Sequence, residues 1–147
     1  MSIRYEPDVI VDRATRAAAE ARPVFGEFFL AKFLGLTIGY DDEARTTSVR
    51  LPYAAHLCNP QGSMHGGVIA TVLDISMGHQ CHHFLSTAVT IEMQQRFLRP
   101  VTADATATGA FVSEGRRIVQ LRSELRDDDG RLLCYGVGSW FRTDGST

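Results

Sequence analysis

The sequence predicts an α+β fold in which an antiparallel sheet surrounds one buried central helix. Residues 68–83 are apolar on nearly every side, and a helix of that kind is usually enclosed at the centre of a fold. Residues 89–141 alternate apolar and polar side chains between turn signals, which is typical of an antiparallel meander. The 147 residues suit one compact domain and are too few for two ordinary ones. We therefore expect a single domain over residues 1–147.

Two helices and two strands precede the central helix. An alanine-rich segment predicts a helix over Val9–Glu20, and a second short helix is expected over Pro23–Leu34. After these, Leu36–Tyr40 and Ala44–Leu51 are expected to form strands, joined by the acidic turn Asp41–Asp42. The second helix carries four aromatic side chains that we expect to pack or to cover a pocket: Phe25, Phe28, Phe29 and Phe33.

The meander after the central helix contains four predicted strands. They are separated by Pro100, by the turn Glu114–Arg116 and by the hairpin signal Asp128–Gly130. In the first of them, the apolar residues Val89, Ile91, Met93 and Phe97 are expected to share one face. The strands are Val89–Phe97, Val101–Ser113, Arg117–Arg126 and Leu132–Phe141.

Composition excludes several classes of protein. The net charge of −2 argues against a nucleic-acid partner, because such modules normally carry a basic surplus. The three cysteines are odd in number and widely spaced, so we expect no disulfide framework and a reducing compartment. No segment has the apolar core of a signal peptide or the length of a membrane span. We expect a cytoplasmic protein with no membrane partner.

The most informative segment is the loop CNPQGSMHGG, which opens the central helix. Backbone N–H groups at a helix start lack partners and lie at the positive end of the helix dipole. Because Gly66 and Gly67 have no side chain, a ligand oxygen can approach these groups and be polarised by them. Asn59, earlier in the loop, has a side-chain amide for the same ligand or for an attacking water. The alternative is that both glycines only allow the loop to pack tightly on the helix.

Asp74 is the anomaly of the central helix. An acid flanked by Leu73 and Ile75 in a buried helix must be paired, protonated or functional. Its structural alternatives are an ion pair with an arginine and a position on a solvent-facing stripe. Eight residues separate Gly66 from Asp74, about 12 Å along a helix, so one copy cannot easily direct both at one carbonyl. If both act, Asp74 must come from a second copy, which predicts a two-fold homodimer with shared sites.

The segment NPQGSMHGGVIATVLDISMG resembles the signature of hotdog-fold acyl-CoA thioesterases, in particular the phenylacetate-degradation (PaaI-like) group. The segments TIEMQQRFLRP, GRRIVQLRSELRDDDGRLL and GVGSWF also resemble that group. The resemblance implies a hotdog core over about residues 35–142, with helices over about residues 1–34 as an N-terminal extension. It implies hydrolysis of an acyl-CoA to a free acid and CoA, with no separate cofactor, by a homodimer or homotetramer.

The resemblance also implies roles for individual residues. Asn59, His65 and Gly66 would hold and polarise the thioester, His65 mainly by orienting the loop. Asp74 of a partner subunit would act as nucleophile or as general base, and Thr90 would help to position water. The expected substrate contacts are Gly67 and Met77 at the acyl group and thioester, and Arg99, Arg116 and Arg117 at the CoA phosphates.

The residues also raise two other chemistries, metal binding and thiol catalysis. His79 and His83 stand one helical turn apart beside Cys81 and His82, but no second ligand group has matching spacing, so we expect no metal. Cys58 lacks the His and Asp arrangement that a thiol nucleophile needs. Two alternative functions remain on the same fold: a non-catalytic acyl-CoA binding module, and an enoyl-CoA hydratase or dehydratase. The second would pair Asp74 with the histidine five residues later.

Overall fold

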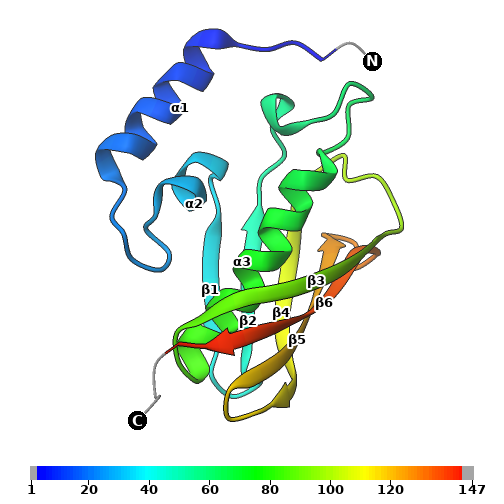
Figure 1. Ribbon diagram of the computed structural model, residues 1–147. Coiled ribbons are helices and arrows are strands. Elements are labelled where there is room, and N and C mark those ends of the chain that lie inside the picture. The colour runs from blue at the N-terminus through cyan, green and yellow to red at the C-terminus, as the bar shows by residue number, and fades with distance from the viewer. Residues whose placement is uncertain (1–2, 144–147) are drawn as a thin grey trace.

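A computed structural model of the chain describes residues 3–143; the outermost residues of the predicted domain, 1–2 and 144–147, lie outside the described range. Two helices are followed by two strands, a long central helix and four further strands (Figure 1). The elements are α1 (Pro7–Glu20), α2 (Phe29–Leu34), β1 (Thr37–Asp41), β2 (Thr46–Leu51), the 3₁₀ turn η1 (Ala55–Leu57), α3 (Gly66–Phe84), β3 (Ala88–Phe97), β4 (Ala105–Glu114), β5 (Ile118–Asp127) and β6 (Leu132–Arg142).

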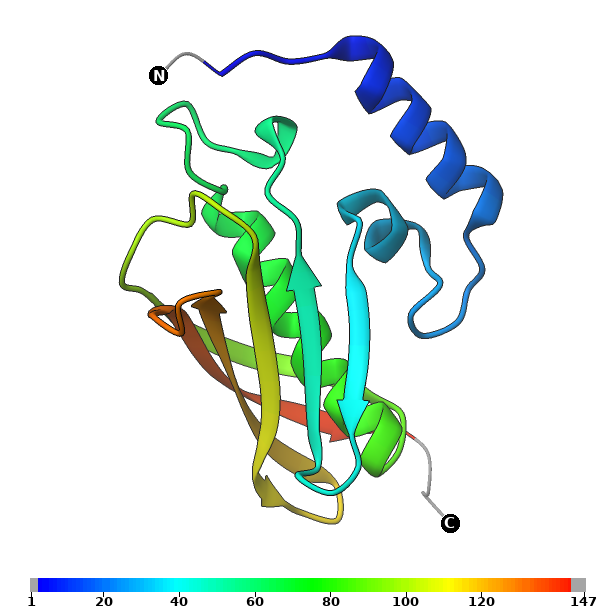
Figure 2. The same ribbon diagram turned by 180° about the vertical axis from the view of Figure 1, so that it is seen from behind.

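The six strands form one antiparallel sheet in the order β1-β2-β4-β5-β6-β3, and the sheet curves around α3 (Figure 1). Seen from behind, β1, β2 and β4 lie side by side with α3 beyond them (Figure 2). This arrangement confirms the predicted antiparallel sheet around a central helix. Among residues 3–143, no helix combines the length and the apolar character needed to cross a lipid bilayer.

The central helix is buried because its apolar side chains fill the space inside the curved sheet. Val72, Leu73 and Met77 of α3 are all 0% exposed. The helix also carries buried polar groups, and each finds a partner on the sheet. Ser76 lies 2.6 Å from Ser123, hydroxyl to hydroxyl, and Thr47 donates to the Gln80 side chain at 2.8 Å. These pairs connect the helix to two different strands.

The structure corrects the predicted boundaries at two points. The second helix begins at Phe29 rather than Pro23, because residues 23–28 follow an irregular path with Gly26 at φ +82°. That φ lies outside the range of a right-handed α-helix, so the helix cannot extend through Gly26; it is a conformation that a non-glycine residue rarely adopts. Strand β4 begins at Ala105 rather than Val101, although the side chain of Val101 is buried.

Strand β3 departs most from its predicted pattern, because it forms the edge of the sheet. A bulge between Thr90 and Glu92 interrupts its register with β6. Met93 packs against the core, whereas Val89, Ile91 and Phe97 are more than half exposed. The expected single apolar face is therefore wrong for most of the strand. What results is an open sheet edge with large apolar side chains on it, a surface that proteins normally pair or cover.

Candidate active site

His65 forms the cap at the start of α3. Its Nδ1 accepts a hydrogen bond from the Gly67 N–H at 2.9 Å, while its backbone carbonyl accepts from Val68 and Ile69. The bond from Ile69 is the first regular bond of the helix, and the other two use N–H groups, those of Gly67 and Val68, that a helix start leaves without i→i−4 partners. The N–H of Gly66 has no hydrogen bond to any residue in the range 3–143. One backbone donor at the positive end of the helix is thus left for a ligand.

Packing explains Gly67 but not Gly66. A Cβ at Gly67 would lie 3.1 Å from Nδ1 of His65, so a side chain there would press on the cap. A Cβ at Gly66 would meet only the Phe97 ring, at 3.6 Å, which is an ordinary van der Waals distance. The tight-packing alternative therefore applies to the second glycine alone. The absence of a side chain at Gly66 leaves its N–H open to approach.

Asn59 shapes the loop that leads into α3. Its side-chain oxygen accepts from the N–H groups of Gln61 and Ser63, at 3.0 and 3.3 Å, and its amide donates to the Ser63 hydroxyl at 2.9 Å. Asn59, Gly66 and Arg99 line a cavity of about 360 Å³ that opens beside the start of α3. We call it the donor cavity, because the free Gly66 N–H belongs to it.

Asp74 lies at a second cavity, further along α3. The hydroxyl of Thr90 donates to its Oδ1 at 2.6 Å. The half-buried carboxylate forms no salt bridge within residues 3–143, so the ion pair considered above is not present in one chain. This cavity has a volume of about 480 Å³ and is mainly apolar. We call it the acid cavity; it is lined by Pro23, Val24, Phe25, Phe28, Leu30, Thr71, Asp74, Ile75, Gly78, His79, Ala88, Val89, Thr90 and Trp140.

The two cavities have no lining residue in common. Asp74 lies in one and Gly66 in the other, about 12 Å apart along α3. The edge strand β3 passes both, with Thr90 at the acid cavity and Phe97 at the donor cavity. A single chain therefore holds two separate halves of the expected reaction centre.

The remaining predicted substrate contacts are dispersed. Met77 was expected to contact substrate, but it is fully buried in the core and lines neither cavity of one chain. Arg99 lies at the donor cavity, but Arg116 and Arg117 lie in the turn between β4 and β5, which strand β6 separates from the other end of β3. One chain does not bring these three arginines together.

The histidines near the end of α3 are held by aromatic rings and a carboxylate. Phe25 stacks on His82 with ring centroids 3.8 Å apart, and Tyr40 stacks on His83 at 3.9 Å. His83 also lies 2.8 Å from Asp42. Among residues 3–143, no group of three or more His, Cys, Asp or Glu side chains has the geometry to hold a metal.

His79 lines the acid cavity together with Asp74, a pairing that the sequence indicated only through the hydratase alternative. It is 1% exposed, and its Nδ1 lies 2.7 Å from the Tyr40 hydroxyl. Burial, and then the nearby His82, lower the pKa of His79 to about 4. Its ring is therefore neutral at pH 7. The sequence gives no signal for the contact with Tyr40, because 39 residues separate the two. Trp140 was missed for the same reason: it reads only as a core position of the last strand.

Comparisons with known proteins show the family and the fold of the chain. Residues 61–134 match the family model of the thioesterase superfamily. A protein of Halobacterium salinarum, assigned provisionally as an esterase, is 30% identical over 149 residues, covering 89% of this chain and 97% of its own length.

Two solved structures share the architecture. A Bacillus halodurans protein crystallised with CoA is similar at a TM-score of 0.80 and 27% identity, over 95% of this chain and 91% of its own. The PaaI protein of Escherichia coli, from the phenylacetic acid degradation operon, has the same fold at a TM-score of 0.77 and 24% identity, over 90% and 97%. The curved sheet, the buried helix and the family match together identify the chain as a hotdog-fold member of the thioesterase superfamily.

Proposed function

We propose that this protein is an acyl-CoA thioesterase whose reaction centres form between two copies of the chain. The observation that carries the proposal is the separation of the two cavities. Asp74 and Thr90 line one, Gly66 and Asn59 line the other, and the open edge of β3 runs past both. The family match and the CoA bound to the Bacillus halodurans relative support the class of substrate.

The edge strand offers a physical route to the dimer. Antiparallel pairing of β3 with a second β3, centred near Met93, brings Thr90 of one copy opposite the end of the strand that carries the partner's Phe97. Since Thr90 contacts Asp74 and Phe97 contacts Gly66, each acid cavity then faces the partner's donor cavity. Such pairing also satisfies the open sheet edge and covers Val89 and Ile91, each 52% exposed in one chain.

In this arrangement each chain contributes a different chemical task. The thioester carbonyl oxygen accepts a hydrogen bond from the Gly66 N–H, which stabilises the negative charge that develops on attack. Asp74 of the other copy either attacks the carbonyl carbon or removes a proton from the water that attacks it. Thr90 holds the carboxylate, or the water beside it, in position. In the general-base route water adds to the carbonyl, the C–S bond breaks and the free acid is released. In the nucleophilic route breakage of the C–S bond leaves a mixed anhydride on Asp74, which water then hydrolyses to the free acid. In both routes the CoA thiolate takes up a proton, and no metal or redox cofactor is required.

The same pairing bears on CoA binding. It brings the β4–β5 turn of one copy towards the end of β3 where the partner's Arg99 lies. Arg116 and Arg117 of one chain and Arg99 of the other then flank a single groove, which suits a phosphate-rich ligand.

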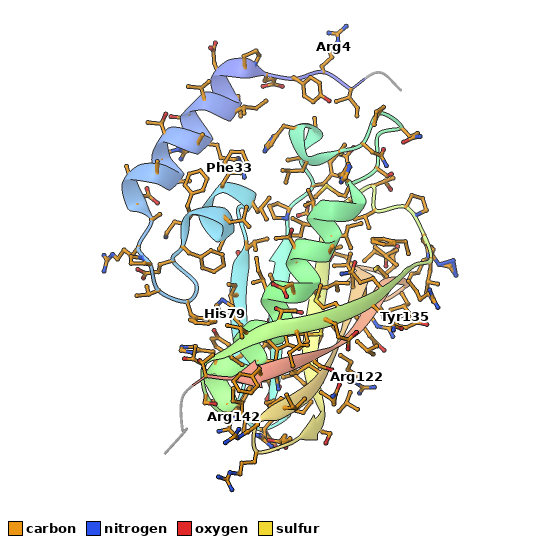
Figure 3. The ribbon with its side chains drawn as sticks, viewed as in Figure 1. Arg4, Phe33, His79, Arg122, Tyr135 and Arg142 are labelled. Carbon is orange, nitrogen blue, oxygen red and sulfur yellow. The ribbon has the colours of Figure 1, made fainter. Side chains whose placement is uncertain are left out.

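The partly exposed apolar side chains on the outer face of the sheet support assembly of two dimers into a tetramer. Four apolar side chains between 38% and 44% exposed lie on or beside β5 and β6 on that face: Ile118, Tyr135, Val137 and Phe141. Two dimers stacked through this face would cover them. Tyr135 is seen on the outside of the sheet, away from α3 (Figure 3).

The test is hydrolysis of a panel of acyl-CoA thioesters, followed with a thiol reagent, for the wild type and Asp74→Asn. We expect turnover by the wild type and loss of at least about a thousandfold in the variant, with unchanged circular dichroism. Equal, slow hydrolysis by both proteins would reject the proposal, and tight acyl-CoA binding without turnover would indicate the binding-module alternative. An enoyl-CoA in the same panel tests the hydratase alternative, which His79 keeps open because it shares the cavity of Asp74.

A single turnover in ¹⁸O-labelled water separates the two routes open to Asp74. Label on the aspartate identifies direct attack followed by opening of the mixed anhydride at the aspartyl carbon, whereas general-base catalysis places the label only in the released acid.

A further inference from the structure

One of the residues that line the acid cavity carries a buried polar atom that has no partner. Within residues 3–143, only two side-chain nitrogens or oxygens are both fully buried and without a hydrogen bond, and Nε2 of His79 is one of them. His79 lines the wall of the acid cavity, beside the loop that joins α1 to α2 (Figure 3). Buried polar groups in native proteins are nearly always paired, so an unpaired one at a cavity wall requires an explanation.

The hydrogen bond at Nδ1 of His79 determines whether Nε2 is a donor or an acceptor. The Tyr40 hydroxyl lies 2.7 Å from Nδ1, and no other acceptor for this hydroxyl is found among the described residues. A phenol is a better donor than acceptor, so the hydroxyl donates and Nδ1 accepts. In a neutral imidazole the proton then belongs to Nε2. The unpaired group is therefore an N–H donor without charge.

Two aromatic rings lie close to this donor, and one of them is partly exposed to solvent. The Phe25 ring stands edge-on to His79 with centroids 5.0 Å apart, and the Phe28 ring lies 6.2 Å away. Both rings line the acid cavity, and the donor itself is buried. Phe25 is 40% exposed and belongs to the irregular segment before α2, and a ligand would reach the buried Nε2 only if a neighbouring side chain such as this one moved.

We infer that His79 is a specificity-determining residue, whose Nε2–H binds a neutral oxygen acceptor on the acyl group of the substrate. The inference rests on the proposed function and names its substrate class: acyl-CoA thioesters with a keto, hydroxyl or ether oxygen remote from the thioester. Five residues separate His79 from Asp74, about 7.5 Å along α3. The oxygen thus lies several carbons beyond the carbonyl that reacts beside Asp74.

The charges at the cavity select the kind of oxygen. A carboxylate on the acyl chain would enter an apolar cavity that already contains Asp74, and the donor that meets it carries no positive charge. A neutral oxygen pairs the buried N–H without bringing in a charge. A purely apolar chain fills the same volume but leaves the N–H unpaired, which makes it the poorer substrate.

The test compares acyl-CoA pairs of equal chain length, with and without one keto oxygen, moved from the third to the eighth carbon. We expect kcat/KM of the wild type to favour one oxygen position by about tenfold to a hundredfold over the unsubstituted chain. His79→Leu should remove this preference, so that its kcat/KM values for the oxygenated and the unsubstituted chain become equal, whatever change it makes to both. His79→Gln, which keeps an amide donor near the Nε2 position, should restore part of it.

The matched control is His56→Leu. The Nε2 of His56 is the other buried, unpaired nitrogen, but His56 does not line the acid cavity, so its loss should leave the preference unchanged. Calorimetric binding of the same pairs to Asp74→Asn repeats the comparison without catalysis. If neither turnover nor binding distinguishes oxygenated from plain chains, or if His79→Leu keeps the preference, the inference is overturned. Hydrolysis without preference would reject the inference alone, whereas absence of any hydrolysis would reject the proposed function.

Discussion

Gly66→Pro is the substitution that isolates the oxyanion donor, because proline removes a single backbone N–H. Gly66 is the first helical residue of α3, where proline is well tolerated and its fixed φ suits the helix. The preceding residue, His65, has an extended conformation with φ −61° and ψ +136°, as a residue before proline requires. A Cβ at Gly66 would meet nothing closer than 3.6 Å. We therefore expect the fold and the His65 cap to survive.

The expected magnitude follows from how the other donors are used. The N–H groups of Gly67, Val68 and Ile69 are already bonded to His65, so none of them can replace that of Gly66. Removal of one oxyanion donor typically costs about a hundredfold to a thousandfold in kcat. KM should change little, because the donor acts mainly on charge that appears in the transition state.

The assay is steady-state hydrolysis of the best acyl-CoA, with Gly66→Ala as the matched control. Alanine adds the Cβ but keeps the N–H, so its kcat should stay within a few-fold of the wild type. Circular dichroism and the thermal midpoint show whether each variant is folded. A folded proline variant with wild-type kcat, or an alanine variant as slow as the proline variant, would refute the role assigned to this N–H.

Two further predictions concern the acid cavity. Thr90→Val removes the 2.6 Å hydrogen bond to Asp74 without changing side-chain shape; kcat should fall by about tenfold, whereas Thr90→Ser should remain close to the wild type, and equal losses in both would point to packing instead. His79 has its pKa lowered to about 4 in the folded protein, so the unfolded chain binds its proton first as pH falls. Its contribution to stability is complete above about pH 6.5 and is lost towards pH 4, a decrease of about 3 kcal/mol in the unfolding free energy. Denaturant melts of wild type and His79→Gln across this range should converge at low pH; parallel curves would contradict the assignment.

Much of the architecture was predictable because local patterns and the fold agree. The apolar residues of α3 fill the interior of the sheet, and the alternation in β5 and β6 is repeated in their burial. The edge strand was not predictable in the same way. Its bulge lies opposite Trp140 and Ser139, and at the neighbouring Gly138 an added Cβ would come 2.5 Å from the Glu92 carbonyl, so the path of β3 depends on residues far along the chain.

Part of the candidate site could likewise be predicted from local sequence, and part depends on the fold. Sequence alone indicated Gly66 and Asp74, because a glycine at a helix start and an acid in an apolar helix are local anomalies. It also indicated that one copy could not join them. It could not indicate the contact between Tyr40 and His79, nor that Met77 turns into the core, since both depend on how the sheet curves around α3.

Complementation between two inactive variants tests most directly whether the reaction centre is shared. Asp74→Ala keeps the donor cavity and Gly66→Pro keeps the acid cavity, so each should be nearly inactive alone. When equal amounts are mixed and allowed to exchange subunits, half of the dimers are mixed and each contains one intact centre. Activity should then return to about one quarter of the wild-type value. If the mixture remains as inactive as its components although exchange is shown, the two residues do not meet across the dimer.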